Sequence, residues 1–450
     1  MDVKLSSAGD VPRQSPRTPL IKGVGPTHMR GSGLLLLLLI LIGSSEAPLK
    51  AARPDFIWFA PGVPGATQDG SEANPFQVSC TADIQEKLDL LDRTRRLCPI
   101  AHFLPGTYNA EDTIDVRSRI TIAGSGMRST IFRKGENNKY PYGIFQNANL
   151  GGGDQIEIRD LAIDCNLRTD GAIALYGDEN TVRNVHVYNH LCRKLDNGSY
   201  SESFAILLSN RVDPFSRKWV NTSGGLVENC LITDFQGHNG GGICIAGGED
   251  PTVATGKVRN CRVVGIENPS IPPGQGDQRW GVGATLTEGC TTENIAIGTY
   301  IEGDTGRTVI RNNHYLNCAF AGVMISVRVS SRINTIEVRN NDINLSDGGY
   351  GIFAVNNFNL NGTLKNLIAE NNRITCRKHV ATAEWCNIFN LPSFVLKNNI
   401  YDSSMVGRIR GSKGYVGLNR SSDGTWSTKP VRLTAPKESK TNQLKAIKAS

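Results

Sequence analysis

The chain has 450 residues, with 49 Lys and Arg against 42 Asp and Glu, and 48 residues are glycine. The positive excess lies at the ends: residues 1–32 hold five basic and two acidic residues, and residues 429–450 hold six basic and one acidic residue. The remaining body is nearly neutral, which argues against a nucleic-acid-binding protein built on a basic face, and the composition excludes a coiled coil, collagen or bulk disorder.

The N-terminal segment predicts export. Residues 34–42 are nine consecutive aliphatic residues that follow Arg30 and precede several small residues. A spanning helix needs about 20 apolar residues, so the run fits the apolar part of a signal peptide better than an uncleaved anchor. We expect residues 1–47 to be a leader that starts at Met1 or Met29. The mature protein is then expected to be secreted or at the cell surface, without a stable membrane span.

The first element expected in the mature chain is a helix over residues 81–97. Thr81 is a suitable N-cap, and Ile84, Leu88 and Leu91 recur on one helical face. Cys80 and Cys98 bracket this helix. Its ends are expected to lie about 20 Å apart, which is too far for a disulfide.

A short pattern then returns nine times between residues 156 and 405. Each copy has an apolar residue or Thr, a charged residue, Asn or Asp, two variable positions and a second apolar residue. The copies begin at Ile158, Val182, Val227, Val258, Thr292, Ile310, Val338, Ala369 and Leu396. An irregular but bounded period of this kind indicates stacked structural units with loops of varying length.

Each unit is predicted to be one coil of β-strands. The sixth position of the pattern is apolar in every copy and the fifth varies freely, which is the alternation of a strand, and a second β-like segment follows most copies. The Asn at the third position suits a sharp corner because Asn tolerates the left-handed region. Stacked coil on coil, the corner side chains are expected to form a hydrogen-bonded ladder: Asn184, Asn229, Asn260, Asn312, Asn340, Asn371 and Asn398.

These repeats resemble the right-handed parallel β-helix superfamily, the fold of pectin and pectate lyases. The segment before them, with HFLPGTY at 102–108, is similar to the entry of many secreted proteins of this fold. The resemblance implies a single all-β solenoid of about ten coils over residues 48–428, with a helix in segment 55–110 that caps its N-terminal end. It is specific for the fold and weak for function, because this fold hosts many activities.

The resemblance also implies where a site would lie. In the lyases each coil has three strands. The strand that follows the corner after the third sheet belongs to the first sheet, and its outward residues form a sugar-binding groove. Taking aliphatic residues as inward, the outward positions here are Ala174, Tyr176, Leu207, Ser209, Cys244, Ala246, Gly283, Thr285, Tyr300, Glu302, Met324, Ser326, Arg328, Phe353, Val355, Phe389 and Leu391. Most are small or apolar, so the charge at Glu302 and Arg328 stands out.

With the resemblance to the lyases of this fold, the charged spot implies a lyase site for an acidic polysaccharide. Glu302 and Asp304 would hold Ca²⁺ against the sugar, and Arg328 would remove the proton next to its carboxylate. Tyr300 and Trp280 are the aromatic residues placed to stack on a sugar ring. Further substrate contacts are expected from Asp277, Arg279, Arg307 and His238. An ordinary surface ion pair between Glu302 and Arg328 is the alternative.

His238 also belongs to GHNGGG at 237–242, which is similar to the Gly-His-Gly of polygalacturonase-type hydrolases. No paired Asp-Asp precedes it, so a tight turn explains the glycines as well.

Cys230 and Cys261 occupy the same position in successive repeats, which predicts an interior stack of thiols. Cys376 and Cys386 are close enough in sequence to close a short loop.

Three functions remain open from the sequence. The first is cleavage of an acidic glycan, and the second is carbohydrate binding without catalysis. The third is a structural or adhesive protein that forms a homotrimer along the apolar strip of Leu207, Met324, Phe353, Val355, Phe389 and Leu391. The basic tail, residues 429–450, has no strand pattern and is expected to be disordered.

Overall fold

The computed structural model describes residues 56–65, 67–93, 99–136, 143–147, 151–169, 171–192, 201, 203–212, 219–220, 223–237, 239–246, 256–266, 278–302, 305–327, 332–346, 348–356, 363–377, 383–423 and 431–433. The predicted leader therefore lies outside the described residues. No helix in the described part of the chain is long and apolar enough to cross a membrane.

The described strands form two large parallel sheets that coil around one interior, as the repeats predict. One sheet has 11 strands, one from each coil. They are β5 (Ile114–Asp115), β8 (Phe145–Gln146), β10 (Gly171–Tyr176), β12 (Phe204–Ser209), β17 (Asn239–Ile245), β20 (Gln278–Gly283), β23 (Ile297–Glu302), β26 (Ala321–Ser326), β29 (Gly349–Val355), β32 (Ala383–Phe389) and β35 (Val406–Arg410).

The other sheet has 25 strands, because two strands of most coils belong to it. They are β1 (Phe56–Pro61), β2 (Phe76–Val78), β3 (Ile100–Phe103), β4 (Gly106–Ala110), β6 (Thr121–Gly124), β7 (Thr130–Lys134), β9 (Glu157–Asp164), β11 (Thr181–Tyr188), β15 (Gly225–Glu228), β16 (Leu231–Phe235), β18 (Gly256–Arg259), β19 (Arg262–Gly265), β21 (Leu286–Glu288), β22 (Thr291–Glu293), β24 (Thr305–Arg311), β25 (His314–Cys318), β27 (Arg332–Arg339), β28 (Asp342–Leu345), β30 (Thr363–Glu370), β31 (Arg373–Cys376), β33 (Phe394–Lys397), β34 (Ile400–Tyr401), β36 (Gly414–Val416), β37 (Arg420–Ser421) and β38 (Val431–Leu433). A small antiparallel pair joins β13 (Arg211–Val212) and β14 (Trp219–Val220).

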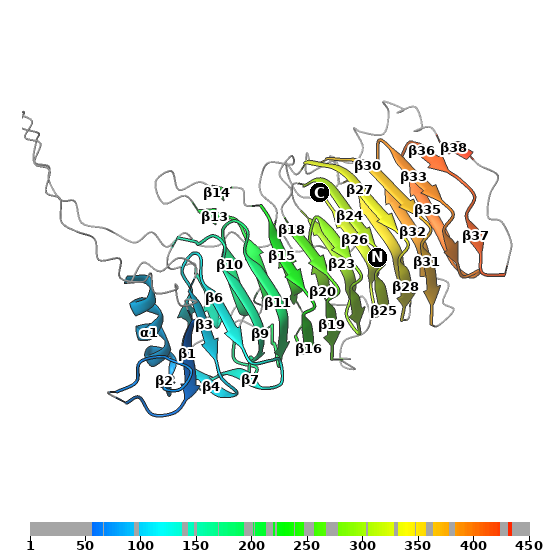
Figure 1. Ribbon diagram of the computed structural model, residues 1–450. Coiled ribbons are helices and arrows are strands. Elements are labelled where there is room, and N and C mark those ends of the chain that lie inside the picture. Colours follow the sequence, from blue (N-terminus) through cyan, green and yellow to red (C-terminus); the bar gives the residue numbers. More distant parts are fainter. Residues whose placement is uncertain are drawn as a thin grey trace, which may run out of the picture. The chain divides into compact units, whose positions relative to one another are not determined.

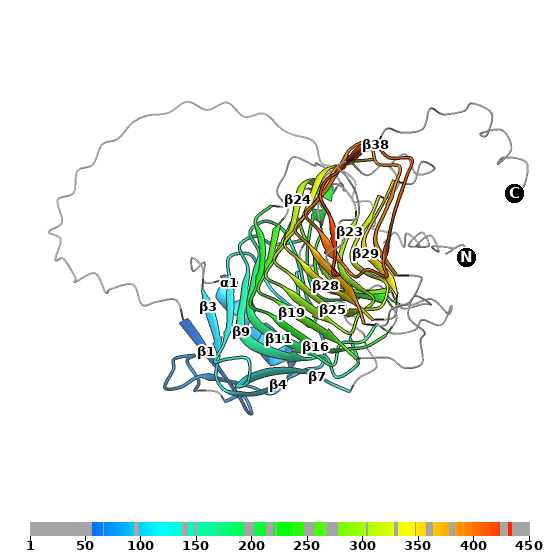
Figure 2. The same cartoon turned by 90° about the vertical axis from the view of Figure 1, so that its right-hand side faces the viewer.

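Successive coils stack strand on strand. The strand β15 pairs with β18, β16 with β19 and β17 with β20, all in parallel, and the same step repeats from coil to coil. Figure 1 shows this succession in chain order, and Figure 2 shows the coils from their C-terminal end. The architecture is therefore the predicted parallel β-helix.

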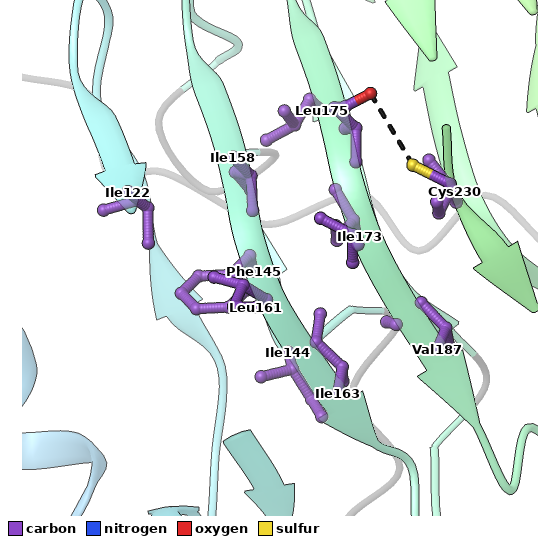
Figure 3. Packing of buried hydrophobic residues seen from close by; sticks show 14 of the residues in the cluster. Ile122, Ile144, Phe145, Ile158, Leu161, Ile163, Ile173, Leu175, Val187 and Cys230 are labelled. Atoms are coloured by element: carbon purple, nitrogen blue, oxygen red, sulfur yellow. Dashed lines mark hydrogen bonds between the residues drawn. The ribbon is translucent and has the colours of Figure 1, made fainter. Parts of the chain in front are cut away.

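The aliphatic positions of the strands fill the interior. Ile158, Ile173, Val187 and their neighbours are fully buried and belong to one continuous cluster. Figure 3 shows these side chains packed between adjacent coils. Alternation along each strand places every second residue in this core, so the apolar period of the sequence fixes which residues face outward.

Each corner of the repeat is a residue in the left-handed region. The φ angles of Asp160 and of the seven predicted corner Asn residues lie between 50° and 58°. An L-residue other than Asn, Asp or Gly pays a steric penalty there, which explains why Asn recurs.

The predicted bond between corner side chains forms where Asn184 Nδ2 donates to Asp160 Oδ1 at 2.9 Å. In the C-terminal coils the side-chain ladder lies one residue later than predicted. Asn313, Asn341, Asn372 and Asn399 follow the corner residues, and each Nδ2 donates to the Oδ1 of the next rung at 2.9 to 3.0 Å. The last acceptor is Asn419. These side chains point into the core, whereas the corner Asn residues supply the turn.

Thiols occupy the same ladder position in earlier coils. Cys230 and Cys261 are buried and adjacent, as predicted, and the Cys230 N–H points to the Cys261 Sγ at 3.4 Å. Cys290 is the next rung, and its N–H donates to Asn313 Oδ1 at 2.8 Å. The cysteines that the structure describes are all free, so Cys376 and Cys386 do not form the disulfide that the sequence allows.

One predicted repeat copy is misplaced. The coil between those of Asn260 and Asn312 turns at Gly289, which has a φ of 65°. Gly replaces Asn because it also adopts the left-handed region without strain. Asn294 sits instead at the following corner, where its Oδ1 accepts a hydrogen bond from Asn317 Nδ2 at 3.1 Å.

The N-terminal end is capped by the helix α1 (Thr81–Arg93), which contacts β5 and β2. Ile84, Leu88 and Leu91 are buried as predicted. Thr81 is not the cap: its Oγ1 accepts from Asp112 N at 3.2 Å, and the Asp83 carboxylate accepts from the N–H groups of Ser79 and Cys80.

The same helix closes the first edge of the 11-stranded sheet. Gln85 Oε1 accepts from Asp115 N at 2.8 Å, and Gln85 Nε2 donates to Asp115 O at 3.3 Å. The side-chain amide thus takes the place of a peptide group on a neighbouring strand, which protects an edge that would otherwise be open.

At the other end, part of the predicted disordered tail is a strand. β38 pairs antiparallel with β36, where Val416 lies opposite Val431 and Gly414 opposite Leu433. The pairing covers the free edge of β36. Residues 431–433 therefore form a strand, contrary to the expectation that residues 429–450 are disordered.

The Asn ladder predicts unequal effects for two adjacent residues. Asn372 accepts from Asn341 N and Nδ2 and donates to Val338 O and Asn399 Oδ1, all within the core. Asn372→Ala leaves several buried groups unpaired and should lower the free energy of unfolding by about 3 kcal/mol or more. Asn371→Gly should change it by less than about 1 kcal/mol, because Gly adopts the corner conformation. Urea denaturation followed by circular dichroism measures both; equal effects would contradict the ladder.

Candidate functional site

The outer face of the 11-stranded sheet has the residues that the sequence predicts. Its central row runs through Ala174, Leu207, Cys244 and Gly283 in one half, where each lies opposite the next. In the other half the row continues through Tyr300, Met324, Phe353, Asn387 and Arg408. The predicted register of these strands is therefore correct.

Aromatic side chains gather on this face. They form a second apolar cluster, separate from the interior core. Phe204 contacts Trp280 with ring centroids 5.5 Å apart, and Trp280 contacts Tyr300 at 5.7 Å. Further along, Tyr350 and Phe353 lie 4.8 Å apart, and Phe320 contacts both. We call these six residues the aromatic strip.

Two glycines make room for Trp280. A Cβ on Gly241 would lie 2.8 Å from the indole ring, and one on Gly283 would lie 3.0 Å from it. The ring therefore lies against bare backbone and is only 9% exposed. Trp280 therefore packs beneath the strip and leaves little of its ring accessible to a ligand. Tyr300, Tyr350 and Phe353 remain partly exposed.

The apolar strip predicted for a homotrimer is smaller than expected. Leu391 is buried in the interior core, because the chain turns after β32. Leu207 and Met324 face outward but are only 6% exposed. Phe353, Val355 and Phe389 remain accessible. The homotrimer stays a prediction.

The predicted charged spot is described only in part. Glu302 is partly exposed on the outer face and lies opposite Ser326. Its predicted partners Asp304 and Arg328 lie outside the described residues, as do Asp277 and His238. Within the described part of the chain, no group of three or more Asp, Glu, His or Cys residues could hold a metal ion. The arrangement of Glu302 with Asp304 and Arg328 that the Ca²⁺ site and the base require therefore lies partly outside the described residues.

Two predicted substrate contacts lie elsewhere. Arg279 is buried, with its Nη1 donating to Phe235 O at 2.7 Å and Ile266 O at 3.1 Å. It binds the backbone at a corner of the coil. Arg307 belongs to β24 in the 25-stranded sheet, and its Nε donates to Glu337 Oε1 at 2.7 Å. Neither guanidinium lies with Tyr300 and Glu302 on the outer face of the 11-stranded sheet.

A polar cluster that the sequence analysis missed lies beyond the aromatic strip. Glu384 is buried on the outer face of β32, opposite Tyr350. Its Oε1 accepts from Arg408 Nε at 2.6 Å, and its Oε2 accepts from Asn387 Nδ2 at 2.8 Å. Burial raises the pKa of Tyr350, and the Glu384 carboxylate raises it further. The phenol is therefore protonated at neutral pH.

The comparisons with known proteins give structural neighbours only. No family model matches the chain, and no curated protein matches it. A tailspike protein of E. coli bacteriophage HK620 in complex with a pentasaccharide is similar in structure, with a TM-score of 0.59 and 11% sequence identity over 78% of this chain. The chain has the right-handed parallel β-helix fold.

Other forms of that tailspike give the same result for this β-helix. A double mutant in complex with the pentasaccharide has a TM-score of 0.56 and 12% identity over 80% of this chain. A mutant with a two-residue deletion has a TM-score of 0.56 and 13% identity. The β-helix spans 65%, 64% and 63% of these tailspike chains, so it matches less than two thirds of each. At such identities the likeness shows the fold alone.

The fold nevertheless explains how distant residues meet on this β-helix. Glu384, Asn387 and Arg408 belong to two adjacent strands, and stacking places them side by side. The sequence signal that would have found Arg408 is the alternation in VGRIR at 406–410, the segment that directly follows the last repeat copy. Ile409 packs against the core, so Arg408 and Arg410 face outward.

Proposed function

We propose that this protein binds a polysaccharide along the outer face of its 11-stranded sheet. The observation that carries the proposal is the series of partly exposed rings of Tyr300, Tyr350 and Phe353 on that face. Tyr300 lies on β23, while Tyr350 and Phe353 lie on β29, two coils further along. Because strands of successive coils lie about 4.8 Å apart, these rings line roughly 10 Å of the face, which suits neighbouring units of a sugar chain. Aromatic faces pack against the apolar C–H faces of sugar rings while nearby polar groups bind hydroxyls.

Two further facts support a glycan as the ligand. The structurally similar tailspike is in complex with a pentasaccharide. The exterior of the 25-stranded sheet, in contrast, has successive ion pairs such as Arg259 with Glu288 and Arg339 with Glu370. The aromatic strip is thus confined to one face, as expected for a binding surface.

The proposal predicts a loss of affinity on removal of the exposed rings. Tyr300→Ala and Tyr350→Ala should each weaken binding about tenfold, or about 1.4 kcal/mol, because each removes a stacking surface. Affinity electrophoresis on a panel of acidic and neutral polysaccharides measures the change. Tyr415→Ala is the matched control, since Tyr415 is exposed on the other sheet. If all three variants bind as tightly as the wild type, the strip is not the binding surface.

A finer proposal is lyase-type cleavage of an acidic glycan. Arg328, as base, would remove the proton on the carbon next to the sugar carboxylate; the bond to the leaving sugar oxygen then breaks and a C=C bond forms. Glu302 lies on the outer face beside Tyr300, as this arrangement requires. Glu302 and Asp304 are the residues proposed for Ca²⁺, which would neutralise the carboxylate when bound.

The cleavage proposal predicts chain scission that creates unsaturated ends and stops with a chelator. Arg328→Ala and Glu302→Gln should abolish scission and keep at least part of the binding, while Arg262→Gln, on the other sheet, should keep both. Ultraviolet absorbance of the unsaturated ends gives the rate. Scission without unsaturated ends would indicate hydrolysis and turn attention to the acidic residues on either side of the GHNGGG segment, Asp234 before it and Glu249 after it. No scission on any acidic glycan would reject cleavage and leave the binding proposal standing.

We also propose that the protein is exported, on the basis of the apolar run at 34–42. The prediction is a mature form that begins near residue 48 and is found outside the cytoplasm. N-terminal sequencing of the protein from the producing cells and their medium tests this. An intact N-terminus on an intracellular protein would overturn it.

A further inference from the structure

The last strand of the 11-stranded sheet has a concentration of positive charge. Arg408 lies opposite Asn387 and Arg410 opposite Phe389, so both extend the outer face. Both are exposed. Residues 406–420 contain four basic residues and no acidic residue, on a body that is otherwise nearly neutral. Residues two apart on a strand have Cα atoms about 6.8 Å apart and side chains on the same face, so both arginines extend from one side of β35.

Arg408 is held in a fixed position by Glu384. The Arg408 Nε donates to Glu384 Oε1 at 2.6 Å, and Asn387 Nδ2 donates to the other carboxylate oxygen at 2.8 Å. The Glu384 side chain is only 6% exposed, whereas the Arg408 side chain is 49% exposed. The carboxylate therefore lies beneath the guanidinium, which is oriented through Nε and still accessible from outside.

We infer that Arg408 and Arg410 form a subsite for an oxyanion substituent of the glycan, with Glu384 as the positioning residue. The inference rests on the proposed function and names the kind of glycan. Guanidinium groups bind carboxylate and sulfate oxygens through paired N–H donors. Tyr350 lies opposite Glu384 and Phe353 opposite Asn387, so a sugar ring on the aromatic strip would have its substituent beside Arg408.

Protection of a sheet edge is the simpler explanation for charge on β35, and it does not account for Glu384. Arginines on an edge strand discourage pairing with other chains, and for this purpose only their charge matters. A buried carboxylate against Arg408 cancels that charge and costs desolvation. A fixed orientation of the guanidinium is what such a pairing provides, and orientation matters for recognition of a ligand.

The experiment compares each acidic glycan with its uncharged counterpart. Hyaluronan and alginate supply carboxylates, with their carboxyl-reduced derivatives as controls, and dextran sulfate with dextran supplies the sulfate arm. The full-length protein should bind at least one charged form about tenfold more tightly than its uncharged form. Arg408→Gln and Arg410→Gln should each weaken binding of the charged form far more than binding of the uncharged form, so that most of the preference is lost; thermal unfolding shows whether each variant is folded. Arg262→Gln, which also removes an Arg paired with a Glu, should leave the preference intact.

Glu384→Gln separates positioning from simple charge. Removal of a negative charge beside the subsite should strengthen anion binding if only electrostatics matters. We expect the opposite, a loss of several-fold, because the guanidinium is no longer held; thermal unfolding shows whether the variant is folded. Stronger anion binding by folded Glu384→Gln would overturn the positioning role. Equal binding of charged and uncharged glycans would overturn the subsite alone, whereas no binding of any glycan would overturn the proposed function itself.

Discussion

The rest of the structure depends on one constraint, the left-handed corner between the two strands that a coil contributes to the 25-stranded sheet. Each coil turns at an Asn, an Asp or a Gly, and the next residue points into the core. In the C-terminal coils that next residue is an Asn of the buried ladder. Because each rung bonds to the next, a coil cannot slip by one residue without leaving amide groups unpaired in the core. Register is thus fixed inside the protein.

A fixed register determines the outer face. If a strand of the 11-stranded sheet shifted by one residue, Tyr300 would face inward and Ile301 outward. The aromatic strip and the polar cluster around Glu384 exist only because several coils keep the same alternation. The loops vary in length without disturbing this, since each coil returns to the same stacked position. The inward side chains, which hold the coils together, and the outward side chains, which form the proposed binding surface, are therefore on opposite faces of the same strands.

The sequence is sufficient to predict the fold and the outward positions of most strands, because strand alternation and Asn corners are local signals. It fails where another residue meets the same physical need. Gly289 turns a corner as well as Asn does, so the repeat copy at Thr292 is displaced. Arg279 satisfies backbone carbonyls in the interior of a corner, a use of Arg that no local pattern shows. Leu391 turns inward because β32 ends at Phe389, and strand ends are not encoded by alternation.

The polar cluster around Glu384 illustrates a different limit of the sequence. Its members come from strands of two adjacent coils, so no single repeat copy brings them together in the sequence. Burial, which sequence does not report, is one part of what sets the cluster apart. Glu337 on the other sheet is equally buried and pairs with Arg307 and Arg339, whereas Glu384 lies opposite an aromatic side chain, Tyr350. Glu288 and Glu370 pair with arginines on the other sheet while remaining partly exposed, and such pairs contribute little to stability. Glu384 is buried and its two oxygens have different partners. Taking this carboxylate out of water is costly, and on a face that is otherwise aromatic the cost is more easily explained by orientation of Arg408 than by stability of the coil.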